Sequence, residues 1–223
     1  LMGLVAGSDV EATFIGDESL SKRPMKRVTV PLKKTGAIIK GQTSNLPIKI
    51  KGSAIPLPIK YHSPVSSAQV KSSILLAGLS SLGKTTIVEP SLSRDHTERM
   101  LKFFGANIST YQLDDKSWKI TLDGIPELNP LNLSIPADPS SAAFPIVSAI
   151  ITPNSKIKVE NVCINELRTG LYKTLIEMGA NIQILNEKEI SGELVADITA
   201  SSSSLKGITV PKSRAASMID EYP

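Results

Sequence analysis

The sequence contains an internal repeat. Residues 94–108 read RDHTERMLKFFGANI, and residues 168–182, which begin 74 positions later, read RTGLYKTLIEMGANI. At the same offset, SSA at 66–68 matches SSA at 140–142, each before an apolar run, and a weaker third copy covers 28–38. Self-similarity at a fixed long period indicates a chain that repeats one supersecondary unit, because each copy buries its apolar face on its neighbours.

Each full copy predicts the same order of elements. A small residue caps an apolar helix, a short β-branched strand follows, and a helix with a polar face then ends at a glycine. Two further strands are joined by a turn at Asp114-Asp115. In the central copy we expect these elements at 67–79, 85–88, 95–104, 107–112 and 117–122. Such a βαβαββ-like unit predicts an α/β (α+β) fold whose sheets are covered by helices.

A proline-flanked segment divides the chain. Residues 132–141 read NLSIPADPSS, with a short β-like run between prolines. Because proline fixes φ and cannot donate to a strand ladder, we interpret this stretch as a crossover between domains. We predict a boundary near Pro136, with residues 1–136 in one domain and 137–223 in the other. Both ends of the sequence read as interrupted helices, so we expect an internal fragment of a longer protein.

Composition argues against several classes of function. The net charge is +4 with only 4% aromatic residues, and the basic residues are spread along the chain, which suits small anionic ligands better than nucleic acid. No stretch approaches 18 consecutive apolar residues, so no membrane span is expected. The single cysteine, Cys163, is expected in the core and favours a reducing compartment. His62 lacks partners at metal-ligand spacing, so no metal site is predicted. His96 could act as a general base, but it is expected on a solvated helix face.

The segment GLSSLGKT at 78–85 matches the nucleotide-binding P-loop pattern letter for letter. That pattern binds phosphate only where a strand precedes the loop and a helix follows it, because the amides at the helix start meet the phosphates. Here an apolar helix is predicted before the loop and a strand after it. We therefore expect Lys84 to lie in a helix-to-strand turn.

Two further segments each allow two interpretations when only their residues are considered. SSAQVKS at 66–72 lies at a predicted helix start, where free amides can seat a phosphate but Ser67 can equally act as a simple N-cap. Asp220 and Glu221 lie at another predicted helix start, where acidic residues stabilise the helix dipole. A carboxylate at the mouth of a phosphate-lined site could instead act as a general base.

Four motifs together suggest a family. DESLSKRPM occupies 17–25, SAQVKS occupies 67–72, SRDHTE occupies 93–98 and SMIDEYP occupies 217–223. In this order and spacing they resemble the bacterial 5-enolpyruvylshikimate-3-phosphate synthases, in particular the class whose helix reads SAQVK. The resemblance spans the whole chain, and the four motifs are specific only in combination.

The resemblance implies an enolpyruvyl transferase fold. In that family two globular domains, each an inside-out α/β barrel of three βαβαββ units, close on substrate. Residues 1–136 would then form about two units of the first, upper domain, and 137–223 the first, truncated unit of the second, lower domain. Family segments that complete the anion clamp have no counterpart in this sequence, so we expect an incomplete fold and an inactive fragment.

The resemblance also assigns substrate-binding residues. Arg23 matches the arginine that holds the phosphate of phosphoenolpyruvate, and a guanidinium fork suits a phosphate dianion. Ser67, Ala68 and Gln69 match the segment that binds shikimate 3-phosphate, with Gln69 also near phosphoenolpyruvate.

The remaining assignments concern the second substrate and the chemistry. Ser93 and Arg94 match positions that contact the shikimate phosphate or carboxylate. Asp220 matches the aspartate that takes the proton from the shikimate 5-hydroxyl. The implied reaction transfers an enolpyruvyl group from phosphoenolpyruvate through a tetrahedral intermediate, without metal or organic cofactor. The implied enzyme is a cytoplasmic monomer of aromatic amino acid biosynthesis, with no nucleic-acid partner.

Three alternatives accompany this expectation. The sister enolpyruvyl transferase that acts on UDP-N-acetylglucosamine shares the repeated unit, but its reactive cysteine belongs in a long stretch of the first domain, where Cys163 does not fall. A P-loop ATPase or kinase would use Lys84. A non-catalytic repeat scaffold would bind neither substrate.

Overall fold

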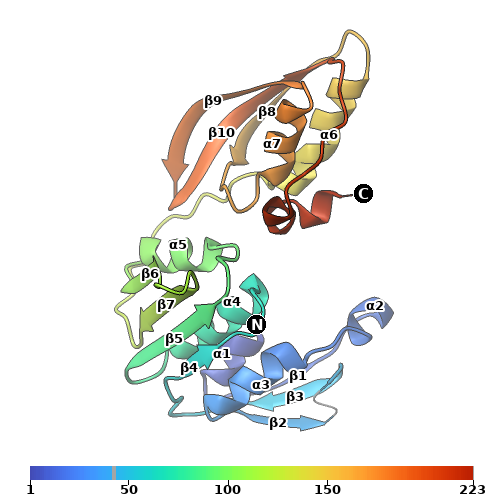
Figure 1. The fold of residues 1–223 in the computed structure, drawn as a ribbon. Coiled ribbons are helices and arrows are strands. Elements are labelled where there is room, and N and C mark those ends of the chain that lie inside the picture. Colours follow the sequence, from blue (N-terminus) through green and yellow to red (C-terminus); the bar gives the residue numbers. More distant parts are fainter. Residues whose placement is uncertain (42–43, 223) are drawn as a thin grey trace. The chain divides into compact units, whose positions relative to one another are not determined.

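The computed structural model describes residues 1–41 and 44–222 (Figure 1). The chain forms two compact units, Leu1–Pro130 and Leu131–Pro223. This division falls a few residues before the boundary predicted near Pro136. The assignment of 1–136 and 137–223 to the two domains of a longer protein stays a prediction.

The first half of the first unit is an antiparallel sheet with three helices. The strand order is β1-β3-β2, and both neighbouring pairs run antiparallel. Helices α1 and α3 each contact α4 (Ala68–Gly78) of the following segment. The elements are α1 (Met2–Ala6), β1 (Glu11–Phe14), α2 (Glu18–Ser21), α3 (Lys26–Lys34), β2 (Ile38–Gly41) and β3 (Ile48–Lys51).

The second half of the first unit is a complete βαβαββ unit. Its four-stranded sheet has the order β4-β5-β7-β6, in which β4 and β5 are parallel and the other pairs antiparallel. The elements are β4 (Lys60–His62), α4 (Ala68–Gly78), β5 (Lys84–Glu89), α5 (His96–Phe103), β6 (Ile108–Gln112) and β7 (Trp118–Asp123). The predicted order of the central copy is therefore confirmed, and the observed bounds lie within one residue of the predicted ones.

The second unit repeats this frame. Its sheet has the order β8-β10-β9, both pairs antiparallel, and a single parallel bridge between Ala137 and Val162 stands where the β4–β5 pairing stands in the first unit. The elements are α6 (Pro139–Ile151), β8 (Lys156–Cys163), α7 (Gly170–Glu177), β9 (Asn181–Ile190), β10 (Glu193–Ser201) and two short 3-10 helices, η1 (Lys212–Ser217) and η2 (Ile219–Glu221).

The repeat extends to individual backbone angles. Gly36, Gly105 and Gly179 end equivalent helices with φ of +94°, +97° and +99°, a region in which residues with a Cβ are strained. In the copies of Gly105 and Gly179, the next amide bonds to the carbonyl five residues back at 2.9 Å. The same sequence signature therefore makes the same helix end each time.

Each unit has its own aliphatic core, as the scarcity of aromatic residues predicts. The best-buried side chains of the first unit are Leu32, Ile48, Ile50, Ile74, Leu75, Ile87, Ile120 and Leu122. Those of the second are Ile146, Ile150, Val162, Val195 and Ile198. Cys163 is buried, as expected for a core residue. No helix among the described residues is long and apolar enough to cross a bilayer.

The loop that matches the P-loop pattern has the reversed order predicted from sequence. Helix α4 ends at Gly78, and β5 begins at Lys84. The Nζ atom of Lys84 lies 2.7 Å from Oδ1 of Asp123, in a surface ion pair. Because no helix start follows the loop, its amides do not form a phosphate seat.

Candidate functional site

The start of α4 is a helix N-terminus without an internal carboxylate. Ser67 is the N-cap in extended conformation, and its side chain accepts a hydrogen bond from the amide of Val70 at 3.4 Å. No acidic residue lies in the first turn. The first amides of any helix lack intrahelical partners and carry a partial positive charge. The amides of Ala68 and Gln69 are therefore suited to an anionic group.

The loop between β5 and α5, residues 90–95, lies beside this helix start. Because β4 and β5 are parallel, the segments that follow them leave the sheet at the same edge. The Ser66 hydroxyl donates to the carbonyl of Ser91 at 2.6 Å and accepts from its amide at 2.9 Å. One turn further along, the hydroxyls of Ser72 and Thr97 lie 2.6 Å apart.

A buried lysine lies beneath these two segments. Lys71, in the first turn of α4, is only 1% exposed. Its Nζ lies 3.1 Å from Oε1 of Glu89 and 2.7 Å from Oε1 of Glu98, and it donates to the carbonyl oxygen of Ser93 at 3.0 Å. The ammonium group donates hydrogen bonds to Glu89 and to the Ser93 carbonyl, whereas it holds Glu98 through charge alone.

Glu89, which ends β5, continues the connection to the loop. One carboxylate oxygen accepts from the Ser93 amide at 2.8 Å, and the other accepts from the Ser93 hydroxyl at 2.8 Å. Ser93 is thus held by its amide, its hydroxyl and its carbonyl. Both its backbone polar groups are tied to the core of the unit, and Arg94 follows directly.

Of the two buried carboxylates, Glu98 has the higher free-energy cost, because it accepts no hydrogen bond from the part of the chain that the structure describes, whereas Glu89 does. Burial raises the pKa of its carboxyl group, although the Lys71 charge opposes the shift. The 2.7 Å contact with Lys71 is an ion pair without hydrogen-bond angles, and neither Glu98 oxygen accepts a hydrogen bond from the described residues. The neighbouring Asp95 charge raises the pKa of Glu98 further.

A cavity of about 720 Å³ lies between the α2–α3 segment and α4, within the first unit. Arg23 and Arg27 line one side, while Ala68, Gln69 and Ser72 line the other. The structure therefore brings together three of the residues predicted to bind substrate. The described lining does not include Ser67, Ser93 or Arg94, which belong to the neighbouring helix start and loop.

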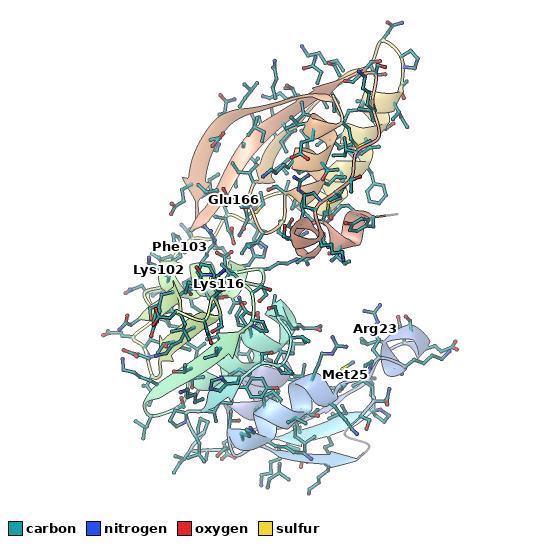
Figure 2. The ribbon with its side chains drawn as sticks, in the orientation of Figure 1. Arg23, Met25, Lys102, Phe103, Lys116 and Glu166 are labelled. Carbon is teal, nitrogen blue, oxygen red and sulfur yellow. The ribbon has the colours of Figure 1, made fainter. Side chains whose placement is uncertain are left out.

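Arg23 lies in the short link between α2 and α3, with Met25 at the far end of that link (Figure 2). Its side chain is exposed, but its backbone is fixed. The side-chain amide of Asn45 lies 3.1–3.3 Å from the carbonyl oxygens of Ser21, Lys22 and Arg23. One amide group on the following loop thus holds the end of α2 and the arginine itself.

Asp220 lies in η2 of the second unit and is exposed. The next residue, Glu221, accepts a hydrogen bond from the hydroxyl of Ser140 at the start of α6. The Ser140 hydroxyl also accepts from Nη2 of Arg168 at 2.8 Å, and the same nitrogen lies 2.7 Å from Oδ1 of Asp138. This chain of polar contacts anchors the segment that carries Asp220.

Asp138 is the N-cap of α6 and accepts from the amide and hydroxyl of Ser141, both at 2.9 Å. Burial alone would raise the pKa of Asp138, but the Ser141 hydrogen bonds and the Arg168 charge outweigh it, so the pKa lies below its ordinary value. The small-residue cap predicted for each copy is therefore wrong for the second unit, because Asp138 caps α6, three residues before Ser141.

Sequence reasoning missed the residues that support the site. Lys71, Glu89, Glu98 and Asn45 were not singled out, although they hold the segments on which the predicted residues lie. One signal was available for Lys71. It stands between Val70 and the buried Ile74 and is the only charged residue of α4, a position where a lysine needs partners.

The chain matches known proteins over its whole length. The family model of EPSP synthase (3-phosphoshikimate 1-carboxyvinyltransferase) matches residues 1–223. The 3-phosphoshikimate 1-carboxyvinyltransferase of Parvibaculum lavamentivorans is 54% identical over 100% of this chain and 50% of its own length. That of Bartonella henselae is 52% identical over 100% of this chain and 51% of its own length.

A solved structure gives the same result in three dimensions. The EPSP synthase of Acinetobacter baumannii superposes with a TM-score of 0.84 at 42% identity, over 99% of this chain and 49% of that one. The chain thus spans about half the length of the relatives it matches. No comparison favours the UDP-N-acetylglucosamine transferase or P-loop alternatives. The chain belongs to the EPSP synthase family.

Proposed function

We propose that the protein to which this sequence belongs transfers the enolpyruvyl group of phosphoenolpyruvate to the 5-hydroxyl of shikimate 3-phosphate and releases phosphate. The product leads to chorismate and the aromatic amino acids. Both substrates are polyanions. The residues that support the proposal are the arginines and the exposed helix start that face one cavity of the first unit.

The phosphoenolpyruvate end of the site rests on Arg23. A planar guanidinium binds two phosphate oxygens at once, which fixes the orientation of the phosphate as well as its place. Arg27 lines the same cavity and adds a second positive charge. Gln69, on the opposite side, can donate to one substrate oxygen and accept from a hydroxyl.

The shikimate 3-phosphate end rests on the start of α4 and the adjacent loop. The amides of Ala68 and Gln69 and the dipole of the 11-residue helix favour a phosphate group there. The Ser67 hydroxyl accepts in the helix cap and can still donate to the ligand, and Arg94 adds a guanidinium nearby. The Ser93 hydroxyl donates to Glu89, so it can only accept from a ligand hydroxyl. The short hydrogen bonds between Ser66 and Ser91 support the close approach of these segments.

Asp220 acts as the general base in this proposal. Its carboxylate takes the proton of the 5-hydroxyl as that oxygen forms a bond to C2 of phosphoenolpyruvate, whose methylene carbon is protonated. The tetrahedral adduct then breaks its C2–O bond to phosphate and loses a methyl proton, which restores the double bond. A positioned base of this kind contributes about 10²- to 10⁴-fold to the rate.

The observation that carries the proposal is the cavity that joins Arg23 to Ala68 and Gln69. The test is a phosphate-release assay with both substrates on a full-length synthase that contains this sequence, together with calorimetric titration of each substrate. The proposal predicts turnover that needs both substrates, and binding of shikimate 3-phosphate rather than UDP-N-acetylglucosamine. Binding of the nucleotide sugar alone would contradict it.

The 223-residue chain is proposed to be inactive by itself, because it spans about half of its relatives. Phosphate release by the purified chain with both substrates would contradict this. The full-length enzyme is proposed to be a cytoplasmic monomer that needs neither metal nor organic cofactor. Sedimentation and turnover in the presence of a chelator test these two points.

A further inference from the structure

We propose that Lys71 is a positioning residue for the shikimate 3-phosphate site: it locks the Ser93–Arg94 loop against the start of α4. The inference rests on the proposed function, in which that loop and the start of α4 bind the same ligand. Lys71 itself is buried and does not reach the ligand. It acts through the backbone of Ser93.

The geometry connects the two halves of the site through one atom. The Lys71 Nζ contacts β5 through Glu89, the loop through the Ser93 carbonyl, and α5 through Glu98. Because Lys71 follows Gln69 by two residues in the first turn of α4, any shift of the ammonium moves the loop and the helix start relative to each other. The remaining ties are the hydrogen bonds of the Ser66 hydroxyl to Ser91 and the contact between the hydroxyls of Ser72 and Thr97.

The chemistry of the group argues for a positioning role above a stabilising one. Burying one ammonium with two carboxylates has a large desolvation cost, and apolar residues of the same volume commonly give equal or greater stability. A charged group holds its partners in a defined direction, however, which apolar packing does not. Ser93 gains from this arrangement a fixed amide, hydroxyl and carbonyl.

The first test replaces the ammonium with an apolar side chain of similar length. In a full-length synthase that contains this sequence, Lys71→Met is expected to raise the KM for shikimate 3-phosphate about tenfold or more, because a displacement of the order of 1 Å has effects of this size or larger. The KM for phosphoenolpyruvate, which depends on Arg23, should change much less. A folded variant with an unchanged KM for shikimate 3-phosphate would overturn the inference.

A second variant separates position from stability. Lys71→Met combined with Glu98→Leu removes both members of the Lys71–Glu98 ion pair, and Glu89 keeps the three hydrogen bonds that it accepts from Ser93. The melting temperature should recover towards the parent value, while the affinity for shikimate 3-phosphate stays about tenfold lower. Recovery of both together would show that Lys71 only stabilises the fold, and would overturn the inference even if the single variant does not fold.

Two controls complete the design. Lys84→Met removes a lysine from an exposed ion pair of the same unit and should leave both KM values unchanged. Calorimetric titration of the parent protein with shikimate 3-phosphate comes first. No binding there would reject the proposed function itself, whereas normal binding by the parent and by both Lys71 variants would reject only the positioning role.

Discussion

The two units begin equivalent helices in different ways. In the first unit α4 starts at Ser67, with no carboxylate in its first turn, and the loop after the next strand is held from below by Lys71. In the second unit α6 starts at Asp138, whose carboxylate caps the helix and pairs with Arg168. Arg94 and Arg168 occupy the same position of the repeat.

The difference shows how one repeated backbone arrangement can support two different roles. An internal carboxylate fills the anion-binding end of α6, and its arginine partner supports, through Ser140 and Glu221, the segment that carries Asp220. At α4 a hydroxyl takes the capping role, and the remaining amides stay suited to a substrate phosphate. We infer that the first unit holds phosphate and the second holds the base.

The largest expected effect concerns the base. In the full-length enzyme, Asp220→Ala should reduce kcat about 10²- to 10⁴-fold while both substrates still bind, because only the proton transfer is lost. Steady-state kinetics with calorimetry of both substrates measures this. Turnover close to the parent value would show that the second unit does not supply the general base.

The next largest effect is expected from a substitution that makes the start of α4 resemble the start of α6. Ala68→Asp places a carboxylate in the first turn of α4, where it repels the phosphate of shikimate 3-phosphate and should weaken its binding about 100-fold. Stability should stay unchanged or rise slightly, because the carboxylate favours the helix dipole. Ser109→Asp, an exposed position on β6, is the matched control and should bind normally.

A smaller effect belongs to the other substrate. Arg23→Ala should weaken phosphoenolpyruvate binding about tenfold or more and leave shikimate 3-phosphate binding nearly intact, since a charged, bidentate contact to one phosphate is lost. Separate titrations with each substrate measure the two affinities. Equal losses for both substrates would show that Arg23 does not distinguish the two ends of the cavity.

The smallest effect is a pH dependence of stability from the buried group. Burial raises the pKa of Glu98 in the folded state, so its contribution is fully present below its unfolded pKa and is lost as the pH rises through the folded value. Glu98→Gln does not titrate. Unfolding at several pH values should therefore show the parent losing stability relative to this variant as the pH rises, and a constant difference would contradict the shift.

Local patterns predicted much of the fold. The order of the βαβαββ unit, the glycine helix ends such as Gly105 and the reversed P-loop order all follow from short-range signals, because caps, periods and turns act over a few residues. The Asp-Pro pair at 138–139 also predicts a helix start.

The supporting residues of the site could not be found in the same way. Lys71 pairs with Glu89, 18 residues later, and its burial depends on how α4, β5 and α5 pack. Asn45 holds Arg23 from 22 residues away, across a strand and a helix. Such contacts are set by tertiary packing, which no local pattern records. The family resemblance suggested which residues bind substrate, and the structure adds the residues that hold them in position.

The central claim is that the phosphate of shikimate 3-phosphate lies at the start of α4 and not at the start of α6. Amide NMR of a full-length synthase labelled with ¹⁵N-alanine tests it most directly, because Ala68 reports on the first helix start and Ala142 on the second. Addition of shikimate 3-phosphate should shift the Ala68 resonance strongly and that of Ala142 much less. An unshifted Ala68 resonance at saturating ligand would contradict the account.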